Sequence, residues 1–225
     1  VHIVVVALLL VTLFEEEVIF QGLVPAWLDR ILSVLLWVWF INLFNFMDGI
    51  DGISGVETLS IGIGLTLLAG SISWEPLGQT YAMVVAGAGL GFLWWNWHPA
   101  KVFLGDVGSV PLGFLLGWLL LNLAANGFWL QALILPLYYL VDSTLTLLER
   151  LSRGEKIWEA HRSHYYQQAV QKGLSHAQVS KSILIGNAVL IGLAVTSTFA
   201  PVTGMVGAVA VVFVMLLYFK QKPQA

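Results

Sequence analysis

The sequence predicts an all-α polytopic membrane protein with about eight transmembrane helices, and its composition, its apolar segments and the placement of its basic residues support this. Of the 225 residues, 58% are hydrophobic and 10% are charged, whereas a soluble domain carries about 25% charged residues. The mean hydropathy is +0.85. Cysteine is absent, which excludes a disulfide framework and a thiolate metal site.

Eight apolar segments follow one another along the chain, and several approach the ~20 residues that a helix needs to cross a bilayer. They are 1–14, 27–46, 53–73, 80–97, 109–125, 128–148, 182–199 and 202–219. The first is interpreted as a transmembrane helix, because it lacks the basic start and the cleavage site of a signal peptide. Turn signals separate later segments at Pro25, Pro76, Pro99, Gly127 and Pro201.

The ten lysines and arginines test this order of segments. If eight helices alternate in direction, nine of the ten fall on one side of the membrane, and Arg30 falls on the other. By the positive-inside rule that side is the cytoplasm, so the polar loops between the segments are expected to carry any catalytic residues there. The whole chain, 1–225, is then one transmembrane domain.

The longest polar connection, 149–181, is expected to be a cytoplasmic loop. Aromatic and aliphatic residues alternate with charged ones over about 155–171, which predicts an amphipathic helix at the membrane surface. Ser175 and Gln178 have the spacing of a capping box, so the next helix is expected to begin there.

Four polar residues recur at every third position near the end of the second segment: Asn42, Asn45, Asp48 and Asp51. Acids at a membrane edge are functional candidates by default. On a helix each step of three residues turns by about −60°, so neighbours in the series touch. Gly49 would break the helix and place Asp51 beyond it. The alternative is a plain turn in which Asp51 caps the following helix.

A second polar cluster lies between the fourth and fifth segments and contains Asn96, Lys101, Phe103, Asp106 and Ser109. Glycines flank Asp106, and Ser109 is a good N-cap, so free backbone N–H groups would face a phosphate there. Asp106 beside them suits a divalent cation that bridges to the phosphate. The alternatives are a tight interhelical turn and, for Lys101, an ordinary positive-inside residue.

The third cluster is His161-Arg162-Ser163-His164. The two histidines are three residues apart and would share a helix face, and Arg162 adds a bidentate phosphate donor. A solvated surface helix is the alternative, and zinc is disfavoured here because no suitably spaced carboxylate accompanies the histidines. With a bound cation to offset the aspartates, the three clusters predict metal-assisted phosphoryl chemistry at the cytoplasmic membrane face.

In this order the clusters resemble the polyprenyl-phosphate N-acetylhexosamine-1-phosphate transferase family, glycosyltransferase family 4. The shared patterns are Asn-x-x-Asn-x-x-Asp-Gly-x-Asp-Gly at 42–52, Phe-x-Gly-Asp-x-Gly-Ser at 103–109 after Asn96, and the histidine loop at 161–167. His-Arg-Ser-His-Tyr-Tyr-Gln is similar to the O-antigen-initiating branch. The resemblance implies transfer of a sugar-1-phosphate from a UDP-activated amino sugar to undecaprenyl phosphate, with release of UMP. This reaction would initiate assembly of a cell-surface polysaccharide such as the O-antigen of lipopolysaccharide.

The resemblance also implies roles for single residues. Asp106 would hold Mg²⁺, with Mn²⁺ as an alternative, and Asn45 would assist. Asp48 and Asp51 would organise the nucleotide and the metal, so the three aspartates form the expected catalytic set. Phe103 resembles the residue that stacks on uracil in some members. The other expected substrate contacts are Asn42, Gly49, Asn96, Lys101, His161, Arg162 and His164.

The implied partners are undecaprenyl phosphate, a UDP-sugar and the lipid bilayer of a bacterial inner (cytoplasmic) membrane. No nucleic acid is expected, and a homodimer is left open. Family members carry an Asp-Asp pair in an earlier cytoplasmic loop, and this chain contains no Asp-Asp. We therefore interpret the chain as the last eight spans of an eleven-span fold. Two alternatives are a transporter, which would place acids near the bilayer midplane, and an inactive truncated fragment of the transferase.

Overall fold

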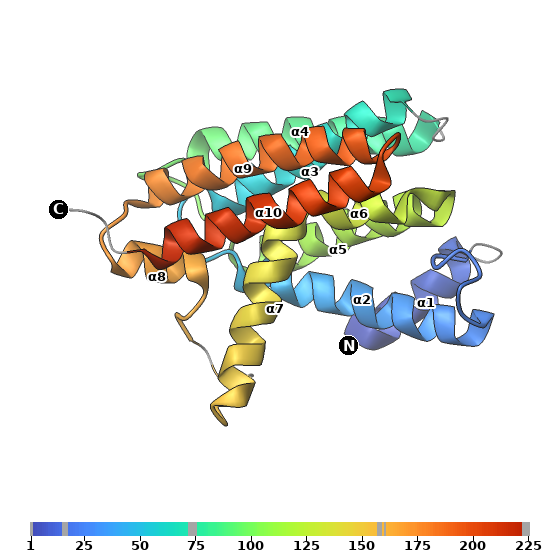
Figure 1. The fold of residues 1–225 in the computed structure, drawn as a ribbon, viewed down its shortest axis with the longest axis horizontal. Helices are drawn as coiled ribbons and strands as arrows, with labels where there is room; N and C mark the ends of the chain where they lie inside the picture. The colour runs from blue at the N-terminus through green and yellow to red at the C-terminus, as the bar shows by residue number, and fades with distance from the viewer. Residues whose placement is uncertain (1, 15–17, 72–75, 157–158, 160, 222–225) are drawn as a thin grey trace.

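The computed structural model describes residues 2–14, 18–71, 76–156, 159 and 161–221, and the regular structure within them is helical, without a strand. The helices are α1 (His2–Leu13), α2 (Ala26–Phe46), α3 (Ile53–Ser71), α4 (Pro76–Asn96), α5 (Gly105–Leu123), the π-helical turn η1 (Ala124–Phe128), α6 (Trp129–Ile134), α7 (Leu137–Ser152), α8 (Tyr165–Gln171), α9 (His176–Ser197) and α10 (Pro201–Lys220). Most of the long helices follow the long axis of the molecule (Figure 1).

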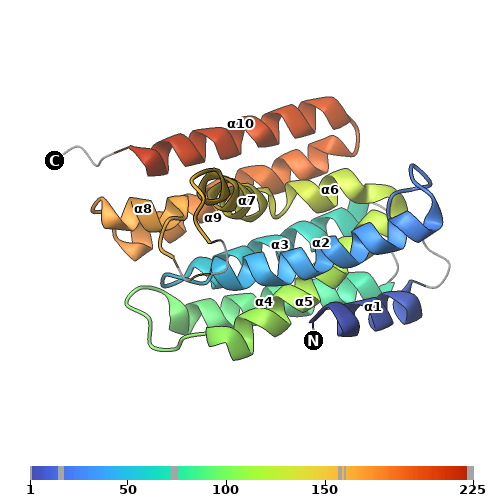
Figure 2. The same ribbon diagram turned by 90° about the horizontal axis from the view of Figure 1, so that it is seen from below.

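Five helical segments in the described residues are long and apolar enough to cross a membrane: 26–46, 53–70, 105–134, 176–197 and 201–220. The predicted all-α polytopic membrane class is thereby confirmed, whereas eight crossings are not shown. The helix α1 is apolar but has 12 residues, fewer than the ~20 that span a bilayer. The helix α4 has 21 residues and runs alongside α3 (Figures 1 and 2).

The predicted sixth span, 128–148, is wrong as a single helix. The helix α6 contains six residues and ends before Pro136, and α7 follows with 16. Proline lacks a backbone N–H and its ring clashes with the preceding turn, so the helix breaks there. In Figure 1, α7 stands across the axis of the bundle. It buries one face and exposes Leu145, Leu148 and Leu151 on the other.

The turn predicted at Gly127 is confirmed and separates α5 from α6 within the 105–134 segment. Gly127 has a φ of 90°, a conformation that glycine adopts without the steric cost of a Cβ. The side chain of Gln21 donates through Nε2 to the carbonyls of Ala124 at 3.1 Å and Ala125 at 2.9 Å. This turn is therefore held against the connection that precedes α2.

Two glycines let α5 approach α2 closely. A Cβ on Gly113 would lie 2.9 Å from the Cβ of Phe44, and one on Gly117 would lie 2.7 Å from Cδ1 of Trp37. Small residues at such contacts are a common device of membrane helix pairs. The close approach brings the end of α2 and the start of α5, which carry two of the predicted polar clusters, to the same end of the bundle.

The helix predicted over about 155–171 is shorter in the structure. Residues 161–164 are not helical, α8 begins at Tyr165, and residues 157, 158 and 160 lie outside the described residues. The predicted capping box before α9 is confirmed. The Ser175 hydroxyl oxygen accepts from Gln178 N at 3.2 Å, and Gln178 Oε1 accepts from Ser175 N at 2.8 Å.

Candidate active site

Three connections meet at one end of the bundle, on the left of Figures 1 and 2. They are residues 47–52 between α2 and α3, residues 97–104 between α4 and α5, and residues 161–164 before α8. These connections carry most of the residues of the three predicted clusters, and hydrogen bonds and close packing join the first connection to the elements of the other two.

Asn96, the last residue of α4, joins the first two connections. Its Oδ1 accepts from Gly52 N at 2.8 Å, and its Nδ2 donates to the Val102 carbonyl at 2.8 Å. Gly52 has a φ of 83°, which favours glycine. Because the Asn96 side chain is buried, it fixes the course of both connections, and this residue supports the site rather than lining an open surface.

Asp48 follows the end of α2 and turns toward α3, where the Ser54 hydroxyl donates to its Oδ1 at 2.6 Å. Burial raises the pKa of Asp48 above its ordinary value; the Ser54 hydrogen bond opposes this rise, and the negative charge of Asp106 adds to it. Asp106 lies in the first turn of α5. Two carboxylates that interact in this way repel unless a cation or a proton offsets their charge.

The two asparagines of the 42–52 motif have different surroundings. The Ser109 hydroxyl donates to Asn45 Oδ1 and so joins α5 to α2. Asn42 instead donates through Nδ2 to the Val38 carbonyl of its own helix at 2.7 Å. The structure therefore ties Asn45 to the second cluster, while the Asn42 amide is satisfied one turn earlier along α2.

Asp51 faces two histidines that the sequence patterns did not single out. Its Oδ2 lies 2.6 Å from Nδ1 of His98 and 3.4 Å from Nδ1 of His176, and Ala100 N donates to it at 3.3 Å. Burial raises the pKa of Asp51, but the hydrogen bonds from His98, Ala100 and His176 outweigh burial, so the pKa lies below its ordinary value. Asp51 is therefore ionised at neutral pH.

The histidine loop reaches the 42–52 motif through α8. A Cβ on Gly49 would overlap the hydroxyl of Tyr166, and that hydroxyl donates to the Phe46 carbonyl at 3.1 Å. The rings of His161 and His164 lie 4.8 Å apart, and His164 is buried. The two rings are neighbours, but the predicted shared helix face is absent, because the backbone of residues 161–164 is not helical.

Three predicted residues stand apart from these contacts. Phe103 is 73% exposed, and the Lys101 ammonium lies 5.7 Å from the centroid of the Trp95 ring. Arg162 lines a separate polar pocket of about 360 Å³ together with Arg153. Lys101 and Phe103 remain accessible to a ligand at the end of the bundle, whereas Arg162 faces a different hollow from the histidine pair.

The comparison with known proteins bears on this arrangement. Residues 1–124 match the model of a family described as glycosyl transferase family 4, and this is more than half of the 225-residue chain. The chain belongs to glycosyl transferase family 4. The matched region contains the 42–52 and 96–109 clusters, so two of the three polar clusters of this family 4 chain fall within it.

Three curated relatives show what this family 4 chain is similar to. A probable undecaprenyl-phosphate N-acetylglucosaminyl 1-phosphate transferase of Bacillus subtilis is 31% identical over 67% of the chain and 43% of the relative. A phospho-N-acetylmuramoyl-pentapeptide-transferase of Moorella thermoacetica is 32% identical over 62% of the chain and 44% of the relative. One of the same name from Thermosynechococcus vestitus is 39% identical over 49% of the chain and 28% of the relative. The chain thus spans less than half the length of these relatives.

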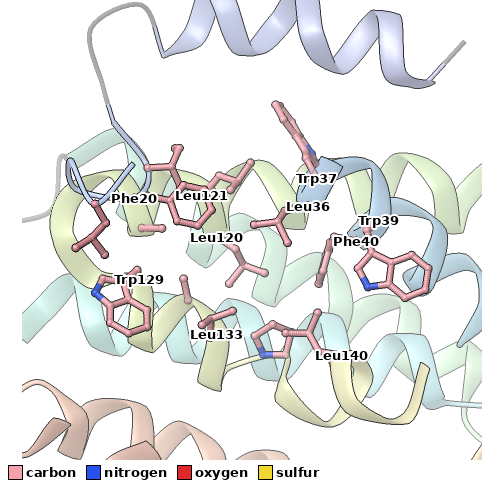
Figure 3. Close-up of a pocket in the computed structure, with 16 residues that line it drawn as sticks. Phe20, Leu36, Trp37, Trp39, Phe40, Leu120, Leu121, Trp129, Leu133 and Leu140 are labelled. Carbon is pink, nitrogen blue, oxygen red and sulfur yellow. The ribbon is translucent and has the colours of Figure 1, made fainter. Parts of the chain in front are cut away.

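The family 4 chain also contains an apolar cavity of about 290 Å³. Its wall combines α2, α5, α6 and α7, with Trp37, Phe40, Leu120, Leu133 and Leu140 among the side chains that face it (Figure 3). The break at Pro136 shapes this wall, because α7 turns away from the bundle there. An apolar chain fits such a lining better than a nucleotide does.

Sequence reasoning missed three residues of this family 4 chain that bear on the site. Asp142 of α7 is fully buried and accepts hydrogen bonds from the backbone of α8. It had a usable signal, because an acid inside an apolar segment is a functional candidate by default. His98 and His176 had none: each stands alone next to a turn, and only the fold brings them to Asp51.

Proposed function

We propose that the protein transfers a sugar-1-phosphate from a UDP-activated N-acetylamino sugar to undecaprenyl phosphate and releases UMP at the cytoplasmic face of a bacterial inner membrane. The observation that carries the proposal is the pairing of Asp48, just after α2, with Asp106, in the first turn of α5. The Ser109–Asn45 hydrogen bond joins these two helix ends, and the charge of Asp106 raises the pKa of Asp48. Membership of the family and the printed names of the relatives support it.

The donor set around Asp48 suits Mg²⁺. Asp48 and Asp106 offer carboxylate oxygens, and their mutual repulsion favours a cation between them. Magnesium prefers one or two carboxylates together with substrate phosphates and water. The Asn45 oxygen already accepts the Ser109 hydroxyl, so we assign Asn45 a supporting contact. Bound there, the ion would offset the negative charge of the transferred phosphate.

The remaining chain supplies binding surfaces for the two substrates. Phe103 is an exposed aromatic ring three residues before Asp106, available to stack on a uracil, and Lys101 is an exposed cation on the same connection. His161 would contact phosphate or sugar, and the buried His164 would support it from beside Asp142. The apolar cavity between α2, α5, α6 and α7 would take part of the polyprenyl chain. The sequence of the histidine loop favours O-antigen initiation as the pathway.

The test measures UMP released from UDP-N-acetylglucosamine by the purified protein, with undecaprenyl phosphate and Mg²⁺ in detergent. Asp106→Asn should lower the rate at least 100-fold, about 2.7 kcal/mol of transition-state stabilisation. Glu159→Gln is the matched control, because Glu159 is exposed and pairs only with Lys156 among the described ion pairs. Unchanged turnover with Asp106→Asn would refute the metal assignment, and nucleotide binding without any product would favour a non-catalytic fragment.

A carrier is the second candidate, because α6 and α7 form a broken helix and an acid is buried inside the bundle. Glu57 of α3 is fully buried and accepts from Asn187 Nδ2 of α9 at 2.7 Å. Broken helices and buried acids are typical of transporters. Substrate flux into proteoliposomes without a lipid-linked product would favour the carrier over the transferase.

A further inference from the structure

Three potential metal ligands converge from three separate parts of the chain. Asp51 lies between α2 and α3, His98 lies between α4 and α5, and His176 is the first residue of α9. One ligand atom from each lies within 4.8 Å of the others. The rings of His98 and His176 have centroids 5.3 Å apart, so both imidazoles and the carboxylate point to a common space.

The backbone that carries Asp51 is held in place from two directions without any ion. The Ser180 hydroxyl of α9 donates to the Asp51 carbonyl at 2.7 Å, and Asn96 accepts from the adjacent Gly52 N–H. The Asp51 N–H donates to Nδ1 of His176 at 3.4 Å. The same Nδ1 lies 3.4 Å from Oδ2 of Asp51, so the backbone and the carboxylate of Asp51 both face this nitrogen.

The cluster is open on one side. The side chains of His98 and His176 are 38% and 33% exposed, whereas that of Asp51 is 13% exposed. An ion can therefore enter from solvent, and water can complete its coordination. Ligand atoms at about 2.0–2.2 Å from a tetrahedral ion lie more than 3 Å apart, so His98, now 2.6 Å from Asp51, would retreat by a fraction of an ångström.

We propose that Asp51, His98 and His176 form a binding site for a divalent transition-metal ion of the zinc class, distinct from the oxygen-donor site at Asp48 and Asp106. Two imidazoles and one carboxylate, with water as a fourth ligand, form a common zinc set. Magnesium instead requires oxygen ligands in near-octahedral geometry, so it is a poor match for two nitrogens. The bound ion would link the two connections to the start of α9. The site goes beyond the proposed transferase function and does not depend on it.

The test uses the metal alone. The protein, purified through a tag without histidines and treated with a chelator, is titrated with Zn²⁺ against a chromophoric competitor, and with Co²⁺ as a spectroscopic probe. We expect one equivalent of Zn²⁺ that millimolar Mg²⁺ does not displace. Asp51→Asn, His98→Gln and His176→Gln should each weaken binding at least tenfold, while Asp106→Asn should leave it unchanged.

Two controls test whether zinc binds at Asp51, His98 and His176 rather than at another histidine pair. His161→Gln tests the other histidine pair and should retain the zinc equivalent. Stabilisation of the wild-type protein by Zn²⁺ in a thermal unfolding experiment, which follows from binding to the folded state, should be lost in His98→Gln and in His176→Gln. Equal zinc affinity in the wild type and in both of these variants, or loss of the site in His161→Gln alone, overturns the proposal.

Discussion

Asp48 and Asp51 are three residues apart in the sequence, and yet their carboxylates contact different groups. The helix α2 ends at Phe46, so the rule that places such residues side by side on one helix no longer holds beyond it. Asp48 turns to Ser54 and Asp106, where burial and like charge favour a cation. Asp51 turns away and forms its contacts with imidazoles. One short motif therefore supplies two chemically distinct environments.

Gly49 lies between these acids, and substituting it tests whether the 42–52 motif and α8 must stay in close contact. Gly49→Ala should destabilise the protein by about 1–3 kcal/mol, the usual cost of overpacking, because the new methyl group overlaps the Tyr166 hydroxyl. Thermal unfolding in detergent measures this cost. Adding Tyr166→Phe should recover part of it, which a double-mutant cycle quantifies.

Gly87→Ala provides the matched control for Gly49→Ala. A Cβ at Gly87 meets nothing within 4 Å, and alanine is favoured over glycine inside a helix. This variant should be neutral or slightly more stable than the wild type. If Gly49→Ala unfolds at the same temperature as Gly87→Ala, the close contact with Tyr166 does not constrain the site.

His161 makes the stability of the histidine loop depend on pH. Burial and the positive charges of His164 and Arg150 lower the pKa of His161 to about 4. In the unfolded chain its pKa is about 6.5, so between these values the unfolded state binds a proton that the folded state does not. The protein should therefore lose stability as the pH falls from about 6.5 to 4.

Unfolding temperatures measured across that pH range check the role of His161. His161→Gln cannot take up the proton, so its unfolding temperature should fall less than that of the wild type. His2→Gln, at an exposed position of α1, should follow the wild type. Parallel curves for the wild type and His161→Gln would contradict a depressed pKa at this residue.

At the scale of elements, a buried carboxylate on α7 determines where α8 begins. Asp142 is fully buried and accepts from the backbone amides of Tyr165 at 2.9 Å and Tyr166 at 3.2 Å, the first residues of α8. The hydroxyls of Tyr138 at 2.8 Å and Thr146 at 3.2 Å also donate to Asp142, and Nδ1 of His164 lies 3.4 Å from its Oδ1. The start of a helix has free N–H groups that a carboxylate stabilises.

Asp142→Asn should loosen α8 and the histidine loop before it. The amide keeps the shape of the carboxylate but gives up charge-assisted bonds, at a cost of about 1–3 kcal/mol. We expect faster hydrogen exchange at the amides of Tyr165 and Tyr166 and a lower transfer rate. Glu149→Gln is the control on the same helix, since Glu149 accepts from the Tyr165 hydroxyl and not from the backbone. Unchanged exchange in Asp142→Asn would rule out this role.

The elements also show what sequence can and cannot specify. Capping and turn signals are local, so the Ser175–Gln178 box and the turn at Gly127 were predictable. Pro136 interrupts a run that is apolar on both sides, and hydropathy alone cannot reveal that the helix leaves the bundle there. The first two predicted clusters are joined through Asn96 and Ser109, whereas Arg162 of the third faces another hollow. The partners of Asp51 arise from tertiary contacts between residues 47 to 125 positions apart, for which the sequence carries no local signal.

At the scale of the whole molecule, α7 links an apolar cavity to a polar site. Leu140, one turn after Pro136, contributes to the cavity wall. Asp142, on the opposite side of α7, holds α8. A lipid phosphate needs this combination, because its chain requires apolar surface and its head group requires charge. Under the proposed function, the break in the sixth segment would place the apolar surface next to the polar site.

Filling the cavity tests this link. Ala132 of α6 lines the cavity, and Ala132→Phe would occupy part of its 290 Å³ without adding any charge. Stabilisation of the protein by undecaprenyl phosphate in thermal unfolding should weaken, and KM for this lipid should rise by roughly tenfold, the loss of about 1.4 kcal/mol of binding. KM for the UDP-sugar should not change, because the nucleotide is proposed to bind at the end of the bundle.

Ala88→Phe makes the same substitution at an exposed position of α4, away from the cavity, and should leave both values unaltered. Equal effects of the two substitutions on the lipid would mean that the polyprenyl chain lies elsewhere, and a parallel rise in both KM values of Ala132→Phe would point to a general distortion of the fold.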